Sequence, residues 1–269
     1  MLAIKNNLMS SNAARNLGNS YDSLSKSVER LSSGLRINSS KDDAAGLAVR
    51  ELMRADIAVL DQGVRNAQDG ISMLQTMEGA TATIDEALIR MKQLAEQAAT
   101  GSYSSTQRTI MNSEFAEMAN EIDRIAGATA FNGITMLNNS AAVSIQFGDS
   151  TDTISVSGAN LTKSGLGIST AGITTASSAS AALASVESAI DSKDTARAAF
   201  GYKMNRLEST VSVLNIQKEN LESAESRISD VDVATEMANM TKNQVLAQTG
   251  ISMLAQANSM PQMALSLLG

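Results

Sequence analysis

The chain lacks the side chains on which most enzyme chemistry depends. Its 269 residues contain no His and no Cys, so a histidine general base, a thiolate nucleophile and a zinc site built from either residue are excluded. The acidic pairs Asp42-Asp43 and Asp230-Val-Asp232 come closest to a cation site. We interpret the first as helix capping, and the second lacks the other ligands and the glycine of a calcium loop. The sequence predicts no enzyme, no metal and no cofactor.

The charge balance and hydropathy restrict the possible partners. The net charge is -7 and the isoelectric point is near 4.8, which disfavours a nucleic-acid binder because such proteins cluster Lys and Arg. No apolar run approaches the roughly 20 residues that span a bilayer, and residues 1–7 do not resemble a cleaved secretory signal. We therefore expect protein partners, with no nucleic acid and no membrane insertion.

The sequence predicts long helices, and these must position any surface through which the chain binds its partners. With 3% aromatic residues and one Pro, residues 1–138 and about 177–269 carry apolar side chains every three or four positions. Two such stripes form a candidate assembly seam, namely Leu17, Tyr21, Leu24, Val28 and Leu31 near the N-terminus and Ile251 and Leu254 near the C-terminus. Steps of four and three are the coiled-coil period, so each stripe should meet a partner helix.

Turn and capping signals divide these helices. Gly34 is a stop signal, and Ser40-Lys-Asp-Asp43 has the pattern of a capping box that opens a helix from about 44 to 99. At 1.5 Å per residue that helix is about 80 Å long. A second capping pattern, Ser104 to Gln107, opens a helix to about Ile125 that Gly127 should end, followed by a turn at Asn132-Gly133.

The segment from about 140 to 176 is rich in Ser, Thr and Gly and has the alternation of strands. Val143, Ile145 and Phe147 share one side of a first strand, and Ile154 and Val156 share one side of a second. The fold class predicted from the whole sequence is mainly α, a long coiled-coil-like helical rod made of paired N- and C-terminal segments with a small β-hairpin region.

The terminal stripes have no third layer within the chain to cover them. They should therefore pair with each other, antiparallel or parallel, and with other copies of the chain. A contact between copies that does not close a ring produces an open helical filament. The residues alone thus predict a self-assembling rod.

Several segments of the chain resemble bacterial flagellin. The longest is Glu29–Ala48, and the others follow in the same order towards the C-terminus. They are Arg65–Ser72, Glu121–Ile125, Phe131–Gly133, Ser226–Asp232, Met253–Asn258 and Leu265–Leu268. The resemblance covers about 1–138 and 177–269, and the short middle makes the chain similar to a form that lacks the outer variable domains.

The resemblance implies a structural subunit that polymerises into the flagellar filament and serves motility. Residues 1–40 and 231–269 would form the inner filament core, and residues 41–230 a rod domain with the β segment at about 140–176. The implied partners are other copies, the flagellar type III export apparatus, a flagellin chaperone, and the filament cap and hook-filament junction proteins. The implied location is secreted, in the extracellular filament. The alternative is a hook-filament junction protein, which shares the terminal helices.

One further site follows from the resemblance. Arg90, Leu94 and Glu114 lie in segments similar to those sensed by the animal Toll-like receptor for flagellin. Arg90 and Leu94 are four residues apart and so share a helical face. We expect an exposed patch that contacts the receptor, packs subunits in the filament, or does both.

Overall fold

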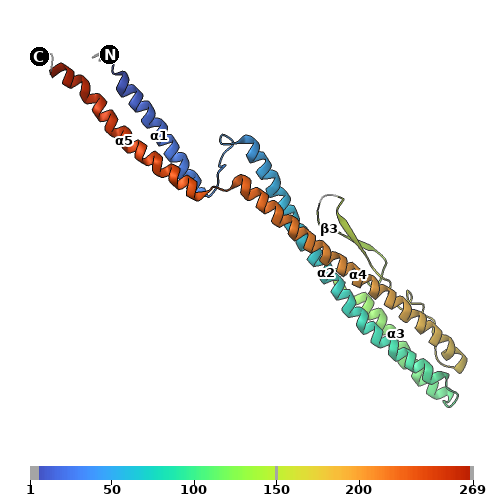
Figure 1. Ribbon diagram of the computed structural model, residues 1–269. Coiled ribbons are helices and arrows are strands. Elements are labelled where there is room, and N and C mark those ends of the chain that lie inside the picture. The colour runs from blue at the N-terminus through green and yellow to red at the C-terminus, as the bar shows by residue number, and fades with distance from the viewer. Residues whose placement is uncertain (1–5, 149–150, 267–269) are drawn as a thin grey trace. The chain divides into compact units, whose positions relative to one another are not determined.

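The structure is a computed structural model that describes residues 6–148 and 151–266 (Figure 1). It confirms the predicted fold class, mainly α with a small β-hairpin region. The helices are α1 (Leu8–Ser33), α2 (Ala44–Ala99), α3 (Ser105–Ala128), α4 (Ala176–Ser229) and α5 (Val233–Ser266). The strands are β1 (Ala130–Phe131), β2 (Ile134–Thr135), β3 (Ala142–Gln146) and β4 (Thr153–Ser157).

The chain divides into two compact units. The terminal unit comprises the chain up to Ile57 and from Glu219 onward, and the middle unit runs from Ala58 to Lys218. Both division points fall inside the long helices α2 and α4. Each unit is therefore built from segments that are far apart in the sequence.

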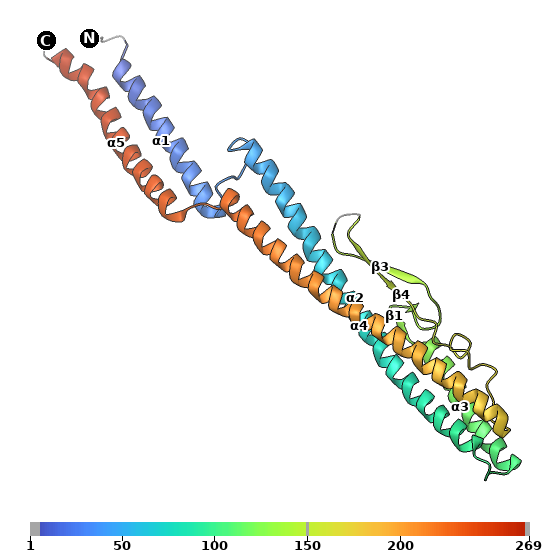
Figure 2. The same ribbon diagram turned by 45° about the vertical axis from the view of Figure 1, so that its right-hand side comes forward.

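In the terminal unit α1 and α5 lie side by side and antiparallel (Figures 1 and 2). The Asn7 amide donates to the Ala257 carbonyl over 2.7 Å near one end, and Arg30 approaches Glu236 to 3.6 Å near the other. At Gly250 the backbones come close, since a Cβ built there would lie 3.1 Å from Leu17 Cδ1. Because Gly250 has no side chain, the two helices pack more tightly than larger residues would allow.

A short two-stranded junction connects these helices to α2 and α4. Gly34 ends α1 in the left-handed region, with φ 73°, as the sequence predicted. Arg36 N then donates to the Ser229 carbonyl over 2.6 Å, and Val231 N donates to the Gly34 carbonyl over 3.0 Å. The predicted capping box at Ser40 was wrong. Asp43 caps α2 by accepting from Gly46 N over 2.9 Å, because Asp43, and not Ser40, directly precedes the helix.

The core of the middle unit lies among α2, α3 and α4. It is built of Leu, Ile, Met and Ala side chains with few aromatic ones. Its largest fully buried side chains include Phe115, Leu74, Met77, Ile84 and Leu88. The boundaries predicted for α2 and the capping box at Ser104 and Gln107 are confirmed. Gly127 does not end α3, which continues to Ala128.

Ion pairs connect α2 to α4 in an antiparallel register. Asp61 pairs with Lys218, Glu78 with Arg197, Asp85 with Lys193 and Lys92 with Glu187. Burial lowers the pKa of Lys193, but hydrogen bonds from its ammonium to Asp194 and Asp85 outweigh that effect and raise the pKa above its usual value. Lys193 therefore remains charged inside the helical contact.

Two antiparallel hairpins follow α3. The predicted Asn132-Gly133 turn is confirmed, with φ 49° and 78°, and it joins the short strands β1 and β2, which the sequence did not reveal. Strands β3 and β4 pair with Val143 opposite Val156 and Ile145 opposite Ile154, and Ile145, Ile154 and Val156 are buried as expected. Phe147 lies just beyond β3. Gly63 and Gly70 let this second hairpin approach α2, where Asn66 Nδ2 donates to the Gln146 carbonyl over 2.8 Å.

Candidate assembly surface

The candidate functional surface is the pair of terminal helices, which use one face for each other. The residues of this α1–α5 seam recur with steps of three and four on both helices. On α1 they are Ser10, Ala13, Leu17, Ser20, Leu24, Ser27 and Leu31, and on α5 they are Glu236, Met240, Asn243, Ala247, Gly250, Leu254 and Ala257. Leucines alternate with small residues, which permits the close approach at Gly250.

Only part of the predicted assembly seam lies between α1 and α5. Leu17, Leu24, Leu31 and Leu254 do lie in the α1–α5 seam, partly buried. Tyr21 and Val28, at 48% and 49% exposure, and Ile251, at 50%, do not. The small residues Ser20 and Ser27 occupy the inward positions that the sequence analysis had given to Tyr21 and Val28. The physical reason is that the larger side chains would hold the two helices apart.

Outside the α1–α5 seam, large apolar side chains of both helices stay exposed, and together they make up what we call the outer face of the terminal unit. On α1 it includes Leu8, Met9, Tyr21 and Val28, and on α5 it includes Val233, Met237, Val245, Leu246, Ile251, Met253 and Met263. Scattered exposed apolar residues are normal, but a concentration of this kind on one helical pair is typical of an interaction surface.

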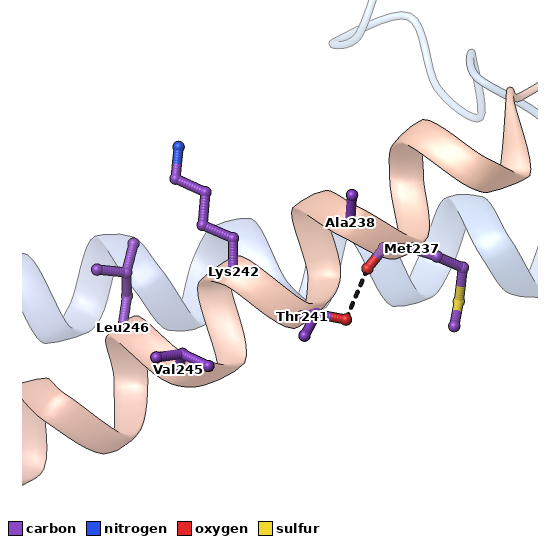
Figure 3. Close-up of a pocket in the computed structure, with 6 residues that line it drawn as sticks. All are labelled: Met237, Ala238, Thr241, Lys242, Val245 and Leu246. Atoms are coloured by element: carbon purple, nitrogen blue, oxygen red, sulfur yellow. Dashed lines mark hydrogen bonds between the residues drawn. The ribbon is translucent and has the colours of Figure 1, made fainter.

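Two hollows lie on this helical pair. A groove of about 410 Å³ between α1 and α5 has Met9, Leu17, Leu246 and Met253 among its lining residues. A second hollow, of about 550 Å³, lies along α5 (Figure 3) and is lined by Met237, Ala238, Thr241, Lys242, Val245 and Leu246. There the Thr241 hydroxyl donates to the Met237 carbonyl over 2.8 Å. Both hollows are largely apolar and hold little that could carry out a reaction.

Charged groups hold the junction rather than form a reactive site. The Lys26 ammonium lies 2.7 Å from Asp42 Oδ1, and this contact with the hydrogen bonds from Ser39 and Asn38 lowers the pKa of Asp42 from 3.8 to about 2. The described part of the chain contains no cluster of three or more His, Cys, Asp or Glu side chains that could hold a metal ion. No described helix is long and apolar enough to cross a membrane.

The three predicted receptor-contact residues differ in their exposure. Arg90 and Glu114 are exposed and form an ion pair between α2 and α3, with 2.6 Å between Arg90 Nη2 and Glu114 Oε1. Leu94 is 2% exposed and belongs to the core of the middle unit, so its expected place in an exposed patch was wrong. Residues four positions apart on a helix point in similar but not identical directions. Here Arg90 lies on the exposed side of α2 and Leu94 on the side that packs in the core.

Long helices paired through small residues, with a second apolar face left uncovered, define a self-assembling structural subunit. Comparison with known proteins gives the family. The bacterial flagellin N-terminal helical region matches residues 4–142, and the bacterial flagellin C-terminal helical region matches residues 183–268. The chain belongs to the bacterial flagellin family. It is a structural subunit that polymerises into the flagellar filament, which serves motility, and it is not an enzyme.

Full-length relatives and a crystal structure agree with this family. The chain is 41% identical over 287 residues to flagellin FlaB2 of Treponema pallidum, covering 99% of this chain and 100% of the relative. It is 37% identical over 303 residues to flagellin of Bacillus subtilis, with the same coverage. The crystal structure of Bacillus cereus flagellin matches with 31% identity and a TM-score of 0.52, covering 60% of this chain and 94% of that one.

A match to a hook-associated protein bears on the fold alone. The structure of a putative flagellar hook-associated protein from Vibrio parahaemolyticus has a TM-score of 0.60 at 13% identity, covering 70% of this chain and 100% of that one. At this identity it shows shared helical architecture and does not favour the hook-filament junction alternative.

Proposed function

We propose that α1 and α5, with the termini at 1–40 and 231–269, form the inner core of the filament, and that residues 41–230 form the layer around it. The observation that supports this is the uncovered apolar face of α1 and α5, which includes Tyr21, Val28 and Ile251. Covering this face with another copy removes apolar area from water, and each Å² contributes about 25 cal/mol. The α1–α5 seam holds the subunit together, and the outer face joins subunits.

A pair of substitutions on α5 separates these two roles. Ile251→Asp places a carboxylate on the exposed face, so the monomer should keep its helix content by circular dichroism while seeded filament growth is lost. Ile251→Leu keeps the apolar surface and should grow filaments normally. If Ile251→Asp also forms filaments of normal length at the normal monomer concentration, the exposed face is not the contact between copies.

We infer that the chain reaches the filament by secretion. In this proposal the flagellar type III export apparatus and a flagellin chaperone handle the subunit, and the filament cap and hook-filament junction proteins contact the growing and basal ends. Membership of the flagellin family supports the route, and the absence of Cys suits a chain that must not cross-link in transit. Deleting the export apparatus in the source cell should leave the protein inside the cell.

We also propose that Arg90 and Glu114 contact the animal Toll-like receptor for flagellin. Their ion pair holds the guanidinium in place on the surface of α2, and an ordered Arg is a common hot spot in interfaces. A receptor-reporter dose response should show a weaker signal for Arg90→Ala than for wild type. Lys92→Ala is the matched control, because Lys92 lies on the same helix but pairs with Glu187 on α4. Equal signals from both variants would rule out a special role for Arg90.

A further inference from the structure

The exposed methionines of the described chain lie in the terminal unit, and the fully buried ones lie in the middle unit. The sequence has 15 Met. Within the described residues, the exposed ones are Met9, Met237, Met253 and Met263, and all of them lie on α1 or α5. In the middle unit Met73, Met77, Met91 and Met136 are buried in the core. Accessible thioethers are therefore concentrated on the helices that carry the apolar outer face.

The exposed thioethers also line the hollows of the terminal unit. Met9 from α1 and Met253 from α5, at 58% and 56% exposure, both line the groove between these helices. Met237 lines the second hollow, where Figure 3 shows its thioether extended away from α5. Oxidation of methionine follows exposure, and the sulfoxide is polar where the thioether is apolar.

We propose that Met9, Met237, Met253 and Met263 are oxidation sites at which peroxide stops the subunit from joining a filament. The thioether sulfur attacks one oxygen of hydrogen peroxide, the O–O bond breaks, and the departing hydroxide leaves as water after proton transfer. The sulfur is oxidised by two electrons to the sulfoxide, and the peroxide is reduced. A methionine sulfoxide reductase with a dithiol reverses the change, giving the thioether, a disulfide and water.

The effect on assembly rests on the proposed function, in which the outer face of α1 and α5 is covered by other copies. A sulfoxide on that face keeps its polar oxygen hydrated in the monomer and loses that water when a second copy covers it. We expect the critical monomer concentration to rise about tenfold for each covered sulfoxide, which corresponds to about 1.4 kcal/mol. The buried methionines of the middle unit should remain reduced, so the monomer should keep its fold.

The test uses purified full-length monomer treated with hydrogen peroxide, with each oxidised residue identified by peptide mass spectrometry and growth followed on filament seeds. We expect treated wild type to need at least tenfold more monomer for growth and to recover after reductase treatment. A variant with Met9, Met237, Met253 and Met263 changed to Leu should grow equally well before and after peroxide. Single variants guard against loss of folding in the fourfold variant, since Met253→Gln should grow poorly and Met253→Leu normally.

The outcomes separate this inference from the proposed function. Normal growth of wild type that carries sulfoxide at the four positions would overturn the inference, and so would equal inhibition of the fourfold Leu variant. Oxidation of assembled filaments tests the surface itself. If Met9 and Met253 react as fast in filaments as in monomers, α1 and α5 are not covered by other copies, and the proposed function fails whatever the effect of the sulfoxide.

Discussion

Gly63 is the position on α2 where one added methyl group should do the most damage. A Cβ built there would lie 2.1 Å from the Phe147 carbonyl oxygen and 2.7 Å from its carbon. Ordinary contact needs about 3.5 Å, so the β3–β4 hairpin would have to move by more than about 1 Å. Overpacking of this kind costs about 1–3 kcal/mol, and the Asn66 hydrogen bond to Gln146 adds about 1 kcal/mol. Ala is about 1 kcal/mol better than Gly in a helix, so Gly63→Ala should destabilise the middle unit by about 2 kcal/mol.

Two other glycines of α2 provide matched controls in urea unfolding followed by circular dichroism. A methyl group added at Gly79 would have no neighbour within 4 Å, so Gly79→Ala should stabilise by up to about 1 kcal/mol. Gly70 would meet the tip of the Ile145 side chain at 2.2 Å, and that tip can rotate away, so Gly70→Ala should lie between the two. If Gly63→Ala is as stable as Gly79→Ala, the hairpin does not rest on α2 as described.

Three further predictions concern helix pairing and charge. Leu254→Asp puts a carboxylate in the partly buried α1–α5 seam, which should destabilise the terminal unit by about 2 kcal/mol and abolish filaments in a sedimentation assay; normal filaments would contradict its place there. The pKa of Asp42 is lowered to about 2 by Lys26, so its stabilising effect is present above pH about 4 and lost as the pH falls towards about 2. Asp42→Asn should remove that part of the stability profile, and an unchanged profile would refute the assignment. Lys92→Glu should destabilise slightly and be rescued by Glu187→Lys, with a coupling of about 0.5 kcal/mol in a double-mutant cycle; zero coupling would show that the pair is not formed in solution.

Much of the fold could be predicted because its signals are local. The bounds of α2, the cap at Ser104 and the stop at Gly34 each depend on residues within a turn or two of the chain. The capping box at Ser40 failed because α2 begins directly after Asp43, whose carboxylate accepts from Gly46 N at the start of the helix. Leu94 was misplaced because exposure depends on what packs against α2, and the sequence of α2 alone does not contain that information.

The same limit explains why the prediction from sequence assigned residues from two different faces of α1 to a single seam. Leu17, Leu24 and Leu31 form a seven-residue repeat that can be completed by Tyr21 and Val28 or by Ser20 and Ser27. Hydrophobicity favours the first set, but α5 presents Ala247, Gly250 and Ala257 to α1, and this surface accepts small neighbours at close range. The small set therefore faces α5, and Tyr21 and Val28 stay exposed on an adjacent face. A subunit that must hold its own helices together and also bind other copies needs two such faces, and the choice between them is fixed by complementarity with α5 rather than by the hydrophobic pattern of α1.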